Sequence, residues 1–203
     1  MSRVRTRPTR DETCDKLFEA AARVFEEQGI GGASIEAIAA AAGFTRGAFY
    51  SNFKSKDELI IAMLEDHVER SIRRHLDLLA QHENIDDFLD ALRNMDHSKQ
   101  DPLGRAPLLH MEMVLFVARA EKRRPELAKR LRARRKLIAD IVETTLKNSG
   151  KTPRNAEWTA AIVLALEDGF RLHRLIDPET TPSDSFLRAI GDLRRALGII
   201  ATS

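Results

Sequence analysis

Residues 43–56 read GFTRGAFYSNFKSK and hold the only tyrosine of the chain, three of its nine phenylalanines and three basic side chains. If Thr45 is the N-cap of a short helix, Phe44 precedes the cap and Phe49 takes the fourth helical position, which is the spacing of a hydrophobic staple. Phe53 follows Phe49 by four residues and continues the same side. The phenylalanines are therefore predicted to anchor a short helix.

The other side of this helix is polar and carries Gly47, Tyr50, Ser51 and Lys54 at the same spacing. A glycine within a helix costs about 1 kcal/mol relative to alanine, so it has a packing reason or admits close approach by another molecule. A DNA major groove accepts one α-helix whose hydroxyls and cations reach base edges and phosphates. An ordinary solvated face is the alternative for Tyr50 and Lys54.

The residues before this helix predict two more helices. An amphipathic pattern over 11–28 ends at Gly29, and a second, shorter pattern has Ser34 as its N-cap and Gly43 after it. Residues 55–58 read SKDE, which has the form of a capping box, so the next helix starts at once. Two short helices separated by a tight turn indicate a helix-turn-helix, and the helix over 11–28 completes a three-helix bundle.

The segment AARVFEEQGIGGASIEAIAAAAGFTRGAFYSNFKSKDELI carries a specific pattern: Phe25, Gly29, Ser34, the pairs Ile38-Ala39 and Ala42-Gly43, Gly47, Tyr50, Phe53 and the helix start from Ser55 to Leu59. Through this pattern, residues 11–60 resemble the DNA-binding domain of the TetR family of transcriptional regulators. The resemblance covers about a quarter of the chain and is diffuse elsewhere.

The resemblance implies roles for individual side chains. Thr45, Arg46, Gly47, Tyr50 and Asn52 are expected at the DNA, and Ser34 and Lys56 near phosphates at helix starts. Arg46 is the expected base reader because arginine can donate two hydrogen bonds to guanine. Asn52 departs from the histidine that is common at this position in the family.

The rest of the chain predicts an all-α regulatory domain. A long helix begins at residue 57 and extends to about 81, and further helices are expected near 85–96, 106–121, 125–148, 155–176 and 183–198, with breaks at 101–104, 125, 150–153 and 177–182. The expected division is a flexible basic arm over 1–10, the helix-turn-helix domain over 11–56, and a helical ligand-binding and dimerisation domain over 57–203. The arm over 1–10 is expected either to contact DNA or to be a solvated tail.

The last two helices carry the expected dimer contact. Ala161, Ala165 and Gly169 recur every four residues, which lets another helix approach closely, and packing within the chain is the alternative. In the resembled family the last two helices pair with their copies. The resemblance thus implies a homodimer, and a twofold dimer implies a palindromic double-stranded DNA operator.

A small-molecule effector is expected to bind near residues 108–118. This segment is apolar on almost every side, which predicts a central helix, and His110 and Glu112 interrupt it. An ordinary core is the alternative. The candidate ligand-contacting residues are His110, Met111, Met113, Phe116 and Phe170.

Composition and motifs limit the other classes of function. The single cysteine suits a reducing compartment, and no apolar run approaches the ~18 residues of a membrane span, so a cytoplasmic protein without membrane contact is expected. Phosphate-binding, dinucleotide, nucleophile-elbow and zinc-protease motifs are absent, so no enzyme activity, cofactor or metal is expected. His67, His75 and His82 lie too far apart on one helix to share an ion.

The expected function is that of a repressor released from its operator by a ligand. The alternative is a small all-α enzyme or ligand carrier whose helix-turn-helix is incidental. Residues 119–136 carry ten bases and two acids, which indicates either a second nucleic-acid surface or, through the apolar residues between them, a solvated helix face.

Overall fold

The computed structural model describes residues 9–82, 85–94, 101–148 and 155–196, and these ranges form helices joined by turns, without a strand. The chain divides into two compact units, one of residues 1–67 and 97–120 and the other of residues 68–96 and 121–203. The expected all-α class is confirmed. The expected domain boundary at residue 56 stays a prediction, since α4 runs through it and contributes to both units.

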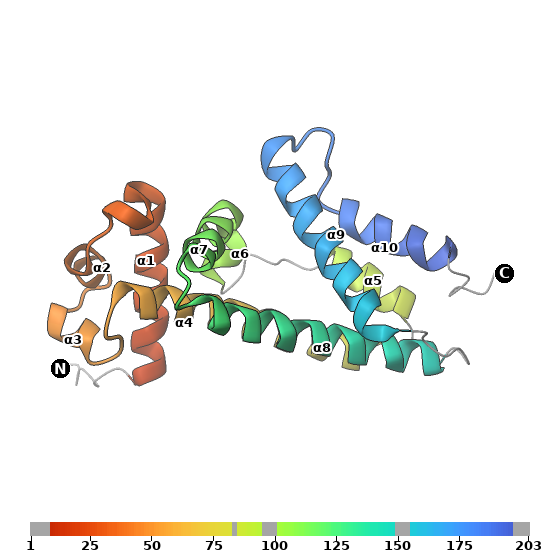
Figure 1. Cartoon of the computed structure of the whole chain (residues 1–203), viewed down its shortest axis with the longest axis horizontal. Coiled ribbons are helices and arrows are strands. Elements are labelled where there is room, and N and C mark those ends of the chain that lie inside the picture. Colours follow the sequence, from red (N-terminus) through yellow and green to blue (C-terminus); the bar gives the residue numbers. More distant parts are fainter. Residues whose placement is uncertain (1–8, 83–84, 95–100, 149–154, 197–203) are drawn as a thin grey trace, which may run out of the picture. The chain divides into compact units, whose positions relative to one another are not determined.

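The first unit contains the N-terminal helices and two later ones (Figure 1). Its helices are α1 (Arg10–Gly32), α2 (Ile35–Ala41), α3 (Arg46–Tyr50), the first part of α4 (Lys56–Ala80), α6 (Pro102–Arg105) and α7 (Pro107–Arg119). In Figure 1, α1, α2 and α3 gather around the beginning of α4.

The starts and ends of the short helices follow from local chemistry. The Ser34 and Thr45 hydroxyls accept hydrogen bonds from the amides of Ala37 and Ala48 over 3.0 and 3.2 Å, so both predicted N-caps are confirmed. Gly29 and Gly43 take φ values of 71° and 74°, a region that disfavours residues with a Cβ. These two glycines therefore allow the chain to turn after the main part of α1 and after α2.

The core of the first unit is apolar and well buried. Phe49 is fully buried, and its ring centroid lies 5.8 Å from that of Phe53, which lies 5.9 Å from that of Phe18 on α1. Leu17, Phe25, Ile38, Leu59, Ile60 and Met63 complete this core. Since a five-residue helix is not stable alone, burial of Phe49 and Phe53 is what holds α3 in place.

Two sequence expectations in this unit were wrong. The break expected at 101–104 contains the one-turn helix α6, because Asp101 caps it, accepting from the Gly104 amide over 3.1 Å, and Pro102 suits the first helical position. Helix α7, which was expected to be a central helix, is buried on one side only. It buries Leu109, Met113 and Val117 but leaves Leu108 and Leu115 more than half exposed.

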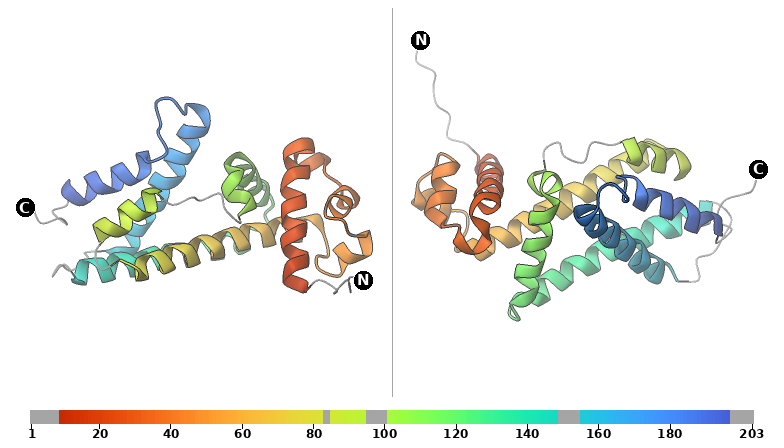
Figure 2. Two further views of the ribbon diagram at one scale, coloured as in Figure 1. Left: turned by 180° about the vertical axis from the view of Figure 1, so that it is seen from behind. Right: turned by 90° about the horizontal axis from the view of Figure 1, so that it is seen from above.

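The second unit contains the remainder of α4 and four further helices, α5 (Ile85–Asn94), α8 (Arg124–Asn148), α9 (Ala156–Ile176) and α10 (Ser185–Ala196). Helices α8 and α9 pack side by side through Ala139, Ala156 and Ala160. Phe88 and Leu92 of α5 pack with Leu187 of α10, and both views in Figure 2 place these helices next to each other.

Within the residues that the structure describes, no helix combines the length and apolar character needed to cross a membrane. The same residues bring together no group of three His, Cys, Asp or Glu side chains that could hold a metal ion. Arg3, Arg5 and Arg7 of the expected basic arm lie outside the described residues.

Candidate nucleic-acid interface

Helix α3 buries one side and exposes the other, as its sequence predicts. Phe49 is fully buried, whereas Thr45, Arg46, Gly47 and Tyr50 are exposed. The Thr45 hydroxyl faces the first turn of the helix, where backbone amides point outward and favour an anion. The exposed side therefore offers a guanidinium, a phenol and a bare stretch of backbone to a partner.

Arg46 is held by contacts with both helices of the pair. Its Nη1 lies 2.8 Å from Oε1 of Glu36 on α2, and its Nη2 lies 3.5 Å from the Tyr50 hydroxyl. The guanidinium carbon is 5.4 Å from the centre of the Tyr50 ring, within the range of a cation–π contact. The hydrogen bond to Tyr50, followed by the charge of Glu36, raises the pKa of Arg46 above its ordinary value.

Gly47 has no explanation within the chain. Its φ lies outside the left-handed region, and a Cβ at this position would meet only the Thr45 hydroxyl, at 3.7 Å, an ordinary contact. The packing reason for a glycine in this helix is thereby removed. Close approach of DNA to this backbone stays a prediction.

Asn52 and Lys56 make contacts inside the first unit. The Asn52 amide donates to the Ala48 carbonyl over 2.9 Å, and its oxygen lies 3.8 Å from the Cys14 sulfur. The Lys56 ammonium donates to the carbonyls of Ile30 and Ala33 over 2.6 and 2.8 Å, where α1 ends. The contacts with Cys14, Ile30 and Ala33 were not foreseen, because each spans more than twenty residues of the chain.

The predicted ligand residues divide between the two units. His110, Met111, Met113 and Phe116 lie on α7 in the first unit, and Phe170 lies on α9 in the second. Met113 is fully buried and the other four are half-buried. Their role as ligand contacts stays a prediction.

His110 belongs to a polar cluster that the sequence did not reveal. Its ring centroid lies 4.6 Å from that of His67 on α4. The Nδ1 of His67 lies 2.9 Å from Oδ2 of Asp101, whose side chain is fully buried. This histidine–carboxylate contact joins α4 to the cap of α6.

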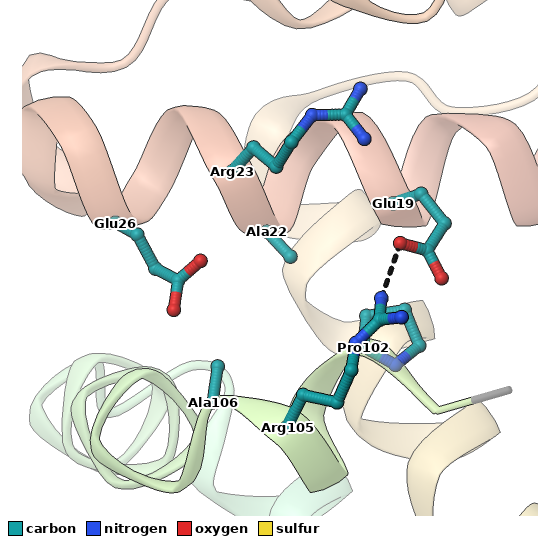
Figure 3. A pocket seen from close by; sticks show the side chains of 7 residues that line it. All are labelled: Glu19, Ala22, Arg23, Glu26, Pro102, Arg105 and Ala106. Carbon is teal, nitrogen blue, oxygen red and sulfur yellow. Dashed lines mark hydrogen bonds and ion pairs between the residues drawn. The ribbon is translucent and has the colours of Figure 1, made fainter. Parts of the chain in front are cut away.

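A pocket of about 330 Å³ lies between α1 and the turn from α6 to α7 (Figure 3). Its charged lining consists of Glu19, Arg23 and Glu26 from α1 and Arg105 from α6, and Glu19 is ion-paired with Arg105. None of the five predicted ligand residues lines this pocket.

The basic stretch over 119–136 is partly neutralised within the second unit. Arg134 pairs with Glu167 over 2.7 Å, Lys136 with Asp140 over 3.2 Å, and Arg130 with Glu126 over 3.5 Å. Arg124, Lys129 and Arg132 are exposed on α8. These pairings favour the solvated-face interpretation of the stretch over a second nucleic-acid surface.

Comparison with known families decides the identity of the fold. A profile described as the tetR family of bacterial regulatory proteins matches residues 17–63, and one described as the C-terminal domain of tetracycline repressor-like proteins matches residues 84–197, more than half of the chain. The chain belongs to the TetR family. This confirms the resemblance and makes the chain a regulatory protein rather than an enzyme.

Individual curated relatives match part of the chain. A probable transcriptional regulator of Pseudomonas putida, ArpR, is 38% identical over 88 residues, which cover 43% of this chain and 40% of the relative. The regulator TtgR of the same species is 36% identical over an equal span. The chain thus spans about two fifths of the length of these curated relatives.

Solved structures match almost the whole fold. A putative transcriptional regulator from Pseudomonas aeruginosa superposes with a TM-score of 0.76 over 96% of this chain and 94% of that one, at 22% identity. A putative TetR-family regulator from Rhodococcus gives 0.70 over 89% and 97%, at 24% identity. Because both identities are below 25%, this similarity shows a shared fold.

Proposed function

We propose that the protein is a DNA-binding transcriptional regulator that reads a palindromic operator as a homodimer and acts as a repressor that a small-molecule effector releases. The observation that carries the proposal is the two-sidedness of α3, which buries Phe49 and exposes Arg46, Gly47 and Tyr50. A short helix that is anchored on one side and polar on the other suits a recognition helix in the major groove.

The residues proposed at the DNA have different tasks. Arg46 reads a base edge, and Gly47 allows the helix backbone to approach the DNA. Tyr50 lies beside Arg46 and presents its hydroxyl on the same exposed side of α3. Ser34 and Thr45 begin α2 and α3, whose first amides favour phosphate oxygens. Asn52 and Lys56 lie at the edge of this surface. The second N–H of the Asn52 amide is proposed to donate to a phosphate. Lys56, whose ammonium donates to the carbonyls of Ile30, Gly31 and Ala33, is proposed to attract a phosphate through its positive charge.

An exposed stripe on α9 supports the homodimer. Trp158, Ile162, Leu172 and Ile176 are between 36% and 74% exposed and recur with Ala165 and Gly169 at alternating spacings of four and three residues. The opposite side of the helix, with Ala156, Ala160 and Leu164, is buried.

The centre of the same stripe is open. A Cβ at Gly169 would meet nothing within 4 Å, so space for the close approach of a second helix is present. Half-exposed Ile190 and Leu193 place α10 in the same proposed interface.

The effector is proposed to bind the helical part over 57–203, with His110, Met111, Met113 and Phe116 of α7 as its contacts. Half-buried methionine and aromatic side chains adapt to varied apolar ligands, and a histidine adds one polar group. An effector that binds one arrangement of the helices better lowers DNA affinity by linkage. The proposed location is the cytoplasm, where an operator is accessible.

A binding assay tests this function. The full chain is titrated against a pool of randomised DNA duplexes, the bound fraction is sequenced, and the affinity of the enriched duplex is measured against a scrambled one at several salt concentrations. We expect a palindromic enriched sequence and an affinity that falls as salt rises. Absence of any sequence-selective, salt-sensitive binding would falsify the proposal.

A further inference from the structure

Glu36 and Arg46 form an ion pair that joins the two helices of the helix-turn-helix. Nη1 of Arg46 lies 2.8 Å from Oε1 of Glu36, and the two side chains are 62% and 55% exposed. Glu36 is the second residue of α2 and Arg46 the first residue of α3. The pair therefore lies on the surface that the proposed function assigns to DNA.

Local structure explains why the carboxylate stays where it is. Glu36 occupies the first turn of α2, and the positive end of a helix dipole stabilises an acidic side chain there. On the other side of the pair, Tyr50 supports Arg46 through its ring and its hydroxyl. The guanidinium is thus positioned between a carboxylate and an aromatic ring before any DNA binds.

The carboxylate of Glu36 affects the binding of two kinds of DNA differently: duplexes with a guanine in reach of Arg46 and duplexes without one. On a duplex that offers no guanine at the right place, Arg46 has no base acceptor, and Glu36 adds only repulsion toward phosphates. Where guanine O6 and N7 are in reach, Arg46 exchanges one carboxylate for two base acceptors. Breaking the pair costs binding energy only on sequences that Arg46 reads, so Glu36 weakens right sequences more than wrong ones and limits the discrimination between them.

We propose that Glu36 limits DNA specificity by competing with DNA for the guanidinium of Arg46. This proposal rests on the proposed function and deepens it, because it assigns a role to a residue that does not itself read a base. Glu36 is a positioning residue that acts through Arg46.

The variant Glu36→Gln tests the proposal, with Glu27→Gln as its control. Glu27 is exposed on α1, so the control makes the same change of charge in the same unit. Both variants and the wild type are titrated against the duplex that the wild type enriches from the random pool and against a scrambled duplex. We expect Glu36→Gln to bind both duplexes more tightly at low salt, about two- to fivefold for the scrambled duplex and by a larger factor for the enriched one.

The ratio of the two affinities is the decisive quantity. The ratio of the affinity for the enriched duplex to that for the scrambled duplex rises in Glu36→Gln and is unchanged in Glu27→Gln, whose lost negative charge acts on both duplexes alike. In an Arg46→Ala background, Glu36→Gln no longer changes the ratio, because the residue through which it acts is gone. A merely structural role would leave the ratio unchanged and instead lower the melting temperature.

Two results would overturn the proposal: equal ratios in Glu36→Gln and Glu27→Gln, or an effect of Glu36→Gln that persists without Arg46. A wild-type protein that enriches no duplex contradicts the proposed function itself. Selective wild-type binding with an unchanged ratio in Glu36→Gln contradicts only the role of Glu36.

Discussion

The ammonium of Lys56, the first residue of α4, donates a hydrogen bond to the backbone carbonyl of Ile30 over 2.6 Å. A second bond, to Ala33 over 2.8 Å, makes Lys56 a cap for the end of α1. A positive charge at the negative end of a helix is favourable, and hydrogen bonds from charged donors are stronger than neutral ones. One side chain thus joins the end of the first helix to the beginning of the fourth.

We expect Lys56→Met to lower the free energy of unfolding by about 1–3 kcal/mol, because two carbonyls lose a charged donor. Thermal or urea unfolding measures this loss, and Lys54→Met, an exposed lysine nearby, is the control. Unchanged stability would remove the capping role. The salt dependence of DNA affinity tests the phosphate contact separately, since a lost contact flattens the slope by about 0.9.

We expect Gly47→Ala to keep or raise the stability of the protein while weakening DNA binding. Its backbone is compatible with alanine, which gains up to about 1 kcal/mol of helix propensity, but the added methyl group occupies the exposed surface. Gly43→Ala is the contrasting variant. Its φ of 74° predicts a loss of about 1–2 kcal/mol in stability. Full DNA affinity in Gly47→Ala would show that nothing approaches this backbone closely.

We expect Ile162→Arg to convert the dimer to a monomer, because a charge in the middle of the α9 stripe would be buried against its copy. Leu131→Arg on α8 makes the same kind of change at a leucine that is 46% exposed and lies outside the stripe. Sedimentation analysis gives the molecular mass of each variant. A monomer in Leu131→Arg and a dimer in Ile162→Arg would place the interface elsewhere.

We expect Glu167 to make stability depend on acid pH. Burial alone would raise the pKa of Glu167, but the charges of Arg134 and Arg171 outweigh it and hold the pKa below the ordinary value of 4.5. A lowered folded pKa contributes stability that is present above pH 4.5 and is lost as pH falls through the folded value.

The variant Glu167→Gln leaves two half-buried guanidinium groups without this carboxylate, so it should lose about 1–3 kcal/mol at pH 7 and depend less on acid than the wild type. Urea unfolding between pH 7 and pH 3 gives the difference between the two proteins. Glu143→Gln, which breaks the exposed pair with Lys147, serves as the control and should lose no more than about 1 kcal/mol. If the free energy of unfolding of Glu167→Gln and of the wild type fell in parallel as pH is lowered, Glu167 would not be the source of the acid dependence.

We expect Asp101→Ala to destabilise the first unit by about 3 kcal/mol or more. The fully buried carboxylate caps α6 and accepts from His67, so alanine removes both contacts. Asp101→Asn keeps an oxygen for the cap and should lose less. Equal losses in the two variants, measured by thermal unfolding, would assign the whole effect to the contact with His67.

Much of the fold could be predicted because helix ends are encoded locally. Ser34 and Thr45 cap the helices that follow them, Gly29 breaks the helical backbone near the end of α1, and Gly43 follows α2 with a positive φ. The one-turn helix α6 was missed because Asp-Pro-Leu-Gly is as suitable for a turn as for a capped turn of helix. Neighbouring contacts decide between these two conformations.

The candidate site could be predicted only in part. Helical spacing correctly separates the buried Phe49 from the exposed Arg46, Gly47 and Tyr50. Spacing does not predict that Glu36 pairs with Arg46, since the pair joins two helices across a turn. The exposure of Trp158 and Ile176 was also missed, because apolar residues on one helix face are equally suited to a core.

The sequence by itself determined the helices, their caps and the family, since these depend on residues within a few positions of one another. The tertiary structure decided where the charges go: Lys56 to the end of α1, Asp101 to His67, and Glu36 to Arg46. Such pairs form only once packing has fixed the angles between helices, because an ion pair or hydrogen bond requires a separation of a few ångströms that chain distance does not set.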